Sequence, residues 1–265
     1  MIKIALGGVA GRVGISIFKI LLERKHTLVA AFEAPGSALI GKPAGQLVLR
    51  DDVTRTIEVF NLPALANADG IIDFSSPDST MTMLDGAVES GKPIVIGTTG
   101  LSGSQVQAVS DAAKTIPVLF SPNMSVGVNL LFKLTAIASE ILGNNYDIEL
   151  LEAHHRYKKD APSGTAKKLA EIIKSRVDAL NGPAEVYDRS KIIGERNKNE
   201  IGISVVRGGD IVGEHTVFFI GNGERIELTH RATSRDTFAL GAVMGLEFIV
   251  KKSPGLYTMT DVLGF

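Results

Sequence analysis

The first part of the chain sets an apolar run, a glycine-rich turn and an amphipathic segment in a fixed order. Residues 2–6 are apolar and end at Gly7-Gly8, and apolar residues then recur at helical spacing at positions 13, 17, 20 and 21. Residues 27–32 are apolar and β-prone, and Glu33 follows them. This order predicts a strand, a glycine turn, a helix and a second strand, which is how a parallel α/β sheet begins.

The same alternation continues to about residue 125. We expect strands over 70–74, 93–96 and 118–120, and helices over 77–90 and 104–114. Alternating strands and helices predict a doubly wound parallel sheet over residues 1–125. Each expected strand ends in small or polar residues, and open parallel sheets bind ligands beyond those carboxyl ends.

Beyond residue 125 the pattern changes. It predicts a helix over 128–142, a strand over 146–153 and an amphipathic helix over 165–180. Strand-like segments follow over 201–206, 214–220 and 224–233, joined by short glycine turns. We therefore expect a smaller α+β domain over 126–235, with a mixed or antiparallel sheet. The pattern then predicts a helix over 238–252 and a short tail over 255–265.

Composition removes several functional classes. The 265 residues carry 28 basic and 29 acidic side chains, a net charge of −1, so we expect no nucleic-acid partner and no anionic membrane surface. There is no cysteine, no signal-peptide pattern and no apolar run near the roughly 20 residues of a membrane span. A soluble, untargeted, cytoplasmic protein is expected, in which any anion-binding site is local.

The glycine turn indicates dinucleotide binding. Its glycines Gly8, Gly11 and Gly14 follow the first expected strand and open the first helix, whose N–H groups suit a pyrophosphate. Glu33 ends the next strand roughly 20 residues later, where a carboxylate can accept both ribose hydroxyls of an adenosine. The alternative is a turn needed only for helix–sheet packing, with Glu33 a solvated acid.

A second motif, HHRYKKDAPSGT over residues 154–165, combines two histidines, several cations and a helix start. The free N–H groups at that start, a Ser163 or Thr165 hydroxyl, Lys158 and His155 suit carboxylates. A histidine that titrates near neutrality can exchange a proton with a bound ligand. In the alternative, Ser163 caps the helix and the basic residues are a solvated loop. No metal is expected, because no third histidine or well-spaced carboxylate accompanies the pair.

Together these stretches resemble the 4-hydroxy-tetrahydrodipicolinate reductase family, also called the dihydrodipicolinate reductases. The resemblance covers essentially the whole chain, and the double histidine followed by Ser-Gly-Thr is its most specific part. The matching stretches are residues 8–14, 97–100, 152–156 with Lys158, 160–165, 207–209, 212–215 and 234–235.

The resemblance implies an NAD(P)H-dependent reductase of the lysine and diaminopimelate pathway. It implies a Rossmann-like N-terminal domain over 1–125 that residues 236–265 complete, and a second domain over 126–235 that binds a small dicarboxylate and builds a homotetramer. In the substrate domain it implies His154 as the acid/base, Lys158 as the proton donor, and substrate contacts from His155, Ser163, Gly164 and Thr165. In the cofactor domain it implies pyrophosphate contacts from Gly8, Val9, Ala10, Gly11, Arg12 and Val13, a ribose contact from Glu33, and nicotinamide-side contacts from Gly97, Thr98, Thr99, Ser121, Pro122, Asn123 and Met124.

One position departs from the family pattern. Many members have arginine directly after the ribose acid, where it suits the 2′-phosphate of NADP, and this chain has Ala34. We expect NADH to be used at least as well as NADPH, unless Arg12 or Lys42 supplies the missing cation. Two other functions remain open from sequence alone: a reductase of another small acid, and a nucleotide sensor without turnover.

Overall fold

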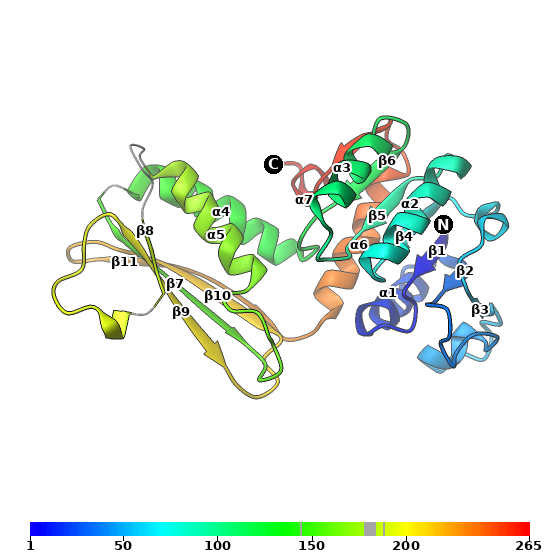
Figure 1. Cartoon of the computed structure of the whole chain (residues 1–265), viewed down its shortest axis with the longest axis horizontal. Coiled ribbons are helices and arrows are strands. Elements are labelled where there is room, and N and C mark those ends of the chain that lie inside the picture. The colour runs from blue at the N-terminus through cyan, green and yellow to red at the C-terminus, as the bar shows by residue number, and fades with distance from the viewer. Residues whose placement is uncertain (144, 178–183, 188) are drawn as a thin grey trace. The chain divides into compact units, whose positions relative to one another are not determined.

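The computed structural model describes residues 1–143, 145–177, 184–187 and 189–265, and these fall into two compact units. Unit 1 comprises Met1–Val126 and Arg235–Phe265, and unit 2 comprises Gly127–Ser234. The last segment of the chain therefore returns to the unit that the N-terminus begins (Figure 1). No helix within the described residues combines the length and the apolar character needed to cross a membrane.

Unit 1 is built on a seven-stranded parallel sheet in the order β12-β6-β5-β4-β1-β2-β3. The strands are β1 (Lys3–Gly7), β2 (Thr27–Phe32), β3 (Ile57–Glu58), β4 (Gly70–Asp73), β5 (Ile94–Ile96), β6 (Pro117–Phe120) and β12 (Gly255–Tyr257). The helices are α1 (Arg12–Glu23), α2 (Pro77–Ser90), α3 (Gly103–Ala112), α6 (Asp236–Ile249) and α7 (Met259–Leu263), with 3₁₀ turns at Ala44–Val48 and Leu62–Leu65.

Helices cover both faces of this sheet. On one face Phe18 of α1 and Leu246 of α6 share a core with the strands, and on the other face Leu84 of α2 and Val109 of α3 do the same. Each such side chain contributes about 1.5–3 kcal/mol by leaving water. The doubly wound sheet predicted from the sequence is confirmed.

The short tail expected over 255–265 is wrong in part. Residues Gly255–Tyr257 form β12, which pairs in parallel with β6, and α7 follows with a capping box between Thr258 and Asp261. Three residues are too few to show an alternating pattern, and the same holds for the two residues of β3. Both unpredicted strands lie at the edges of the sheet.

The strand order reverses between β1 and β4. From β1 the chain proceeds outward to β2 and β3, and then returns to β4 on the other side of β1. Such a switch point opens a crevice beyond the carboxyl ends of the two strands, where doubly wound proteins bind their ligands. The glycine turn follows β1 at this edge.

Unit 2 carries a five-stranded mixed sheet in the order β11-β10-β7-β9-β8, which confirms the expected second sheet. Its strands are β7 (Asp147–His154), β8 (Ala184–Val186), β9 (Glu200–Arg207), β10 (Gly213–Ile220) and β11 (Arg225–Ala232), and a 3₁₀ turn spans Arg189–Lys191. Helices α4 (Val126–Leu142) and α5 (Gly164–Arg176) lie on the same side of the sheet (Figure 1) and bury its core, which includes Leu131, Leu169 and Phe219. Residues 178–180 of the expected helix 165–180 lie outside the described residues.

Strands β9 and β10, although linked by only the five residues 208–212, are not paired with each other. Strand β7 lies between them, parallel to β9 and antiparallel to β10. The register sets His154 at the end of β7 opposite Arg207 of β9, and Ala153 opposite Glu214 of β10. The central strand therefore brings side chains from three distant parts of the sequence to its carboxyl end.

Candidate active site

The glycine turn of unit 1 is too tight for side chains at two positions. Gly8 has a φ of +69°, and a Cβ there would lie 2.4 Å from the Phe74 carbonyl oxygen. A Cβ on Gly14 would lie 2.0 Å from the Gly8 carbonyl oxygen. Gly11 caps α1 without a side-chain hydrogen bond, so the first N–H groups of the helix receive no side-chain cap. This geometry suits an anion such as a pyrophosphate.

Glu33 is tied to the same turn. Its Oε2 accepts a hydrogen bond from the Ala10 N–H at 3.0 Å, and its Oε1 accepts one from the Ala34 N–H at 3.0 Å. Each carboxylate oxygen has a second lone pair, so the side chain can still accept a hydroxyl donor. Of the other turn residues, Val9 is buried in the core, Val13 is half-buried and Arg12 is exposed.

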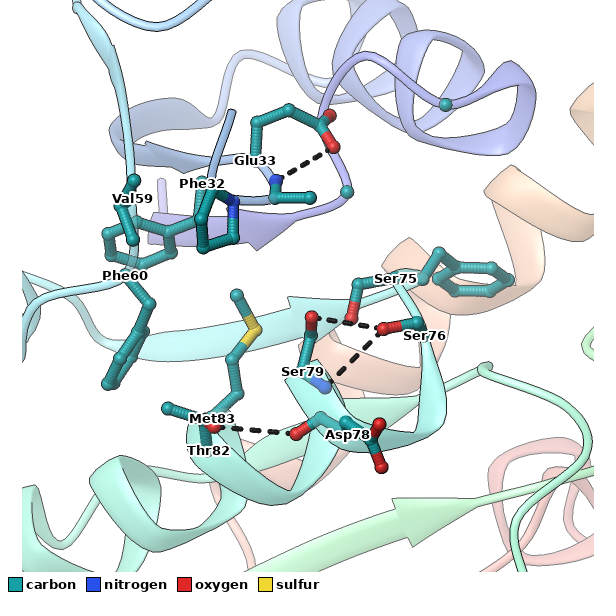
Figure 2. A pocket seen from close by; sticks show the side chains of 15 residues that line it. Phe32, Glu33, Val59, Phe60, Ser75, Ser76, Asp78, Ser79, Thr82 and Met83 are labelled. Atoms are coloured by element: carbon teal, nitrogen blue, oxygen red, sulfur yellow. Dashed lines mark hydrogen bonds between the residues drawn. The ribbon is translucent and has the colours of Figure 1, made fainter. Parts of the chain in front are cut away.

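A pocket of about 450 Å³ opens beside Glu33, at the switch point (Figure 2). Figure 2 shows Glu33 on one side of the space and Ser75, Ser76 and Ser79 on the other. Its lining residues are Gly8, Gly11, Phe32, Glu33, Ala34, Pro35, Val59, Phe60, Phe74, Ser75, Ser76, Asp78, Ser79, Thr82 and Met83.

The character of this lining fits an adenosine. Phe32, Val59 and Phe60 supply apolar surface for a base, and Glu33 supplies an acceptor for ribose hydroxyls. The described lining residues include two acids and no lysine or arginine. Sequence reasoning expected a ligand beyond the strand that Ser75 and Ser76 follow, but it did not identify Val59, Phe60 or Ser79 of α2. The strand that positions Val59 and Phe60 is only two residues long.

The loops after β4 and β5 are held together by a buried acid that sequence reasoning missed. Asp73 Oδ2 accepts hydrogen bonds from the Thr80 hydroxyl at 2.5 Å and the Thr98 hydroxyl at 3.2 Å, and Thr98 Oγ1 accepts the Ser75 N–H at 3.1 Å. Burial raises the pKa of Asp73, and the hydroxyl hydrogen bonds oppose this. Thr98 is thus fixed in place, with Gly97 packed under the Phe74 ring and Thr99 next along the loop.

The turn from β6 to α4 lies at the same edge of the sheet. The Ser121 hydroxyl donates to the Asn123 carbonyl at 2.9 Å, and the Ser125 N–H donates to Asn123 Oδ1 at 2.9 Å. Met124 is buried, and a Cβ on Gly241 would lie 1.7 Å from its carbonyl oxygen. Helix α6 therefore packs directly on this turn, in which Pro122 also lies.

In unit 2, His154 is buried at the end of β7. Its Nδ1 lies 2.6 Å from Glu152 Oε2, and its ring packs edge-on against His215, with ring centroids 5.2 Å apart. Burial lowers the pKa of His215 to about 3, and the proximity of His154 adds to the effect. His215 is therefore neutral near pH 7.

Glu152 is fully buried and saturated with donors. Oε2 accepts from His154 and from Arg207 Nη1 (2.8 Å), and Oε1 accepts from Arg207 Nη2 (2.8 Å) and the Ser163 N–H (3.0 Å). Burial alone raises the pKa of Glu152, but hydrogen bonds from His154, Arg207 and Ser163 outweigh it and lower the pKa to about 2. Sequence reasoning missed the pair formed by Glu152 and Arg207. The position of Glu152, an acid at an inward position of an apolar strand, was a signal.

The remaining residues of the 154–165 segment separate into two environments. Half-buried Lys158 pairs with Asp160 at 2.9 Å, and His155 is also half-buried. Ser163 is 2% exposed and caps α5: its Oγ accepts from the Ala166 N–H at 3.2 Å and lies 3.1 Å from His215 Nε2. This is the capping role given above as the alternative. Gly164 and Thr165 form the first turn of α5.

Comparison with known proteins decides the family. Residues 2–124 match the N-terminal domain of dihydrodipicolinate reductase, and residues 127–263 match the C-terminal domain. The chain belongs to the dihydrodipicolinate reductase family. The family expected from the sequence is confirmed.

Members of the dihydrodipicolinate reductase family resemble the chain over its full length. The 4-hydroxy-tetrahydrodipicolinate reductase of Magnetococcus marinus is 46% identical over 100% of this chain and 99% of its own. That of Aromatoleum aromaticum is 43% identical over 99% of this chain and 95% of its own. A dipicolinate-bound dihydrodipicolinate reductase from a Paenisporosarcina species shares the fold, with a TM-score of 0.77, 24% identity and 98% of each chain covered.

Proposed function

We propose that this chain catalyses the pyridine-nucleotide-dependent reduction of 4-hydroxy-tetrahydrodipicolinate to tetrahydrodipicolinate in lysine and diaminopimelate biosynthesis. A hydride and a proton are added to the ring, and its hydroxyl leaves as water. Relatives that are 43–46% identical over nearly the whole chain carry this activity in their names. The observation that carries the proposal is the buried His154, which Glu152 holds in the unit that also bears Lys158 and the start of α5.

In this proposal unit 2 handles the substrate and the protons. His154 and Lys158 exchange protons with the ring. Hydride addition to a conjugated imine leaves a negative charge on the ring, and a proton must be supplied to neutralise this charge. The N-terminus of α5, with Ser163, Gly164 and Thr165, binds substrate carboxylates together with His155. The N–H groups of that first turn suit an anion even though the Ser163 hydroxyl is used as the cap.

Unit 1 binds the nicotinamide nucleotide, which supplies the hydride when bound. Gly8, Gly11 and the start of α1 suit the pyrophosphate, and Glu33 suits the adenosine ribose. The loops that carry Thr98 and Ser121 follow the carboxyl ends of β5 and β6, and in this proposal they contact the nicotinamide half of the cofactor. In this proposal the pyrophosphate is also contacted by Val9, Ala10, Arg12 and Val13. The nicotinamide side is also contacted by Gly97, Thr99, Pro122, Asn123 and Met124.

NADH serves at least as well as NADPH in this proposal. Beside Glu33, Ala34 offers no charge, and the described pocket lining contains Glu33 and Asp78 without a cation. A charge-assisted contact to a 2′-phosphate is worth about 1.5–3 kcal/mol, or roughly 10–100-fold in affinity. Without it, nothing in that lining compensates the repulsion between a 2′-phosphate and two carboxylates.

A nucleotide-oxidation assay with freshly generated hydroxy-tetrahydrodipicolinate tests both proposals. We expect turnover with this substrate above that with other imino and keto dicarboxylates, and kcat/KM for NADH equal to or above that for NADPH. Ala34→Arg should raise kcat/KM for NADPH about tenfold, whereas the uncharged control Ala34→Gln should not. A tenfold wild-type preference for NADPH would contradict the cofactor proposal and direct attention to Arg12 and Lys42.

We also propose a cytoplasmic homotetramer built through unit 2. Apolar side chains at helical spacing lie exposed along α4 (Leu130, Leu134, Ile137 and Ile141), and others lie exposed on the sheet (Val205, Val206, Ile220 and Ile226). Faces of this kind favour association. Light scattering on the eluting protein should give four times the chain's mass of 28.1 kDa, and a monomeric mass would contradict the proposal.

A further inference from the structure

Glu152 and Arg207 form an ion pair whose partners come from neighbouring strands and whose carboxylate faces His154. Arg207 donates to both oxygens of Glu152 in a bidentate arrangement, and Glu152 is completely shielded from solvent. A buried pair of this kind is expensive to assemble and is weak support for stability. Its position beside a residue assigned to proton transfer points to another role.

The hydrogen bonds determine which nitrogen of His154 carries a proton. Apart from His154, Arg207 and the Ser163 N–H donate three hydrogen bonds to the carboxylate and favour its ionised form, so Glu152 has no proton to donate at neutral pH. The 2.6 Å contact between Glu152 Oε2 and His154 Nδ1 therefore requires the proton to reside on Nδ1. The other nitrogen, Nε2, is left to exchange a proton with a ligand.

A glycine leaves room at that second nitrogen. Gly213, the first residue of β10, faces His154, and a Cβ built on it would lie 3.0 Å from Nε2. Tighter contacts than this are rare between real side chains, so alanine at this position would crowd the exchanging nitrogen. Glu152 thus occupies Nδ1 of His154, and the absence of a side chain at Gly213 leaves space at Nε2.

Arg207 also reaches the segment that carries Lys158. Its Nη2 donates to the Asp160 carbonyl oxygen at 2.7 Å, and the Asp160 carboxylate pairs with the Lys158 ammonium at 2.9 Å. One guanidinium therefore supports the carboxylate behind His154 and the backbone beside Lys158. The planar fork of arginine makes these contacts at once, which a lysine ammonium does not.

We infer that Glu152 and Arg207 are positioning residues for proton transfer, which fix His154 as the Nδ1–H tautomer with Nε2 available and hold the Lys158 segment beside it. The inference rests on the proposed acid/base role of His154. A carboxylate behind a histidine is a known means of fixing its tautomer and orientation. Here the carboxylate is itself fixed by an arginine from the next strand.

The wild-type protein provides the first test, by ¹⁵N NMR of ring-labelled histidine assigned with His154→Gln. We expect neutral His154 to carry its proton on Nδ1, and a spectrum dominated by the Nε2–H form would overturn the inference. Glu152→Gln should remove this tautomer preference, because Arg207 claims the single amide oxygen and leaves the NH₂ group toward His154. The measurement of the His154 tautomer in the wild-type protein does not depend on whether a Glu152 variant folds.

Kinetics provide the second test. Glu152→Gln and Arg207→Lys should lower kcat at least tenfold with an unchanged Kd for NADH, Glu152→Asp should restore part of the loss, and Gly213→Ala should also lower kcat. The matched control is Glu227→Gln, which breaks the exposed Arg225–Glu227 pair of the same sheet and should leave kcat unchanged. If His154→Gln is inactive while Glu152→Gln keeps both full kcat and the wild-type tautomer, only this inference fails. If His154→Gln is fully active, the proposed role of His154 fails.

Discussion

The clearest energetic prediction concerns the acid sensitivity of Glu152. Its pKa falls from 4.5 to about 2 on folding, and each unit is worth about 1.4 kcal/mol, so the fold is about 3 kcal/mol more stable with Glu152 ionised than with Glu152 protonated. Because the folded pKa is depressed, this stability is complete well above pH 4.5 and is lost as the pH falls toward 2. At pH 3.5 about half of it, roughly 1.4 kcal/mol, is gone.

Glu152→Gln isolates this contribution. At pH 7 the substitution leaves half-buried Arg207 without its counter-ion, which should cost about 3 kcal/mol, the lower end of the range for a buried pair. At pH 3.5 the wild-type protein has lost about half of the stability that ionised Glu152 adds, so the difference between the two proteins should be smaller by about 1.4 kcal/mol. His215, whose depressed pKa also weakens the fold below pH 6.5, titrates in both proteins and largely cancels in the difference.

Urea unfolding followed by far-UV circular dichroism gives the two free energies of unfolding at each pH, and suits a chain without tryptophan. The reasoning is refuted if the difference between wild type and Glu152→Gln is the same at pH 7 and pH 3.5. That result would mean that the four donors do not hold the carboxylate as an anion.

Two further predictions concern unit 1. Gly14→Ala places a Cβ 2.0 Å from the Gly8 carbonyl oxygen, so the turn must shift, and calorimetry should show NADH binding at least tenfold weaker. The control Gly103→Ala has open space around the new Cβ and should bind NADH normally. Equal affinities of the two variants would remove the turn from the cofactor site. Asp73→Asn keeps an acceptor for the Thr80 and Thr98 hydroxyls, and burial disfavours the ionised carboxylate that it removes, so the free energy of unfolding at pH 7 should stay within about 1 kcal/mol of wild type. Asp73→Ala leaves both hydroxyls without this acceptor and should cost about 1–3 kcal/mol. A larger loss for Asp73→Asn would show that the charge itself is needed.

The parallel sheet was predictable because its inner strands are continuous apolar runs flanked by helices with a clear period. The edge strands β3 and β12 were not, since two or three residues carry no period and their pairing depends on neighbours already in place. The glycine turn with Glu33 was visible for a different reason: a strand, a glycine turn, a helix, a second strand and an acid follow one another within residues 2–33.

The network behind His154 was beyond sequence reasoning. Glu152 and Arg207 are 55 positions apart, and they meet because β7 lies between β9 and β10, an order that the short glycine link between those strands does not reveal. The contact between Ser163 and His215 spans 52 positions and depends on the same order. The local motif showed which residues carry chemistry, and the sheet order shows what holds them.

The most direct test of the whole account is the steady-state reduction of hydroxy-tetrahydrodipicolinate by wild type and His154→Gln, with NADH affinity measured in parallel. The account predicts turnover by the wild type and a kcat lowered by about 10²–10⁴ in the variant, with an unchanged Kd for NADH. Equal kcat in the two proteins would contradict it, because the buried histidine would then have only a structural role.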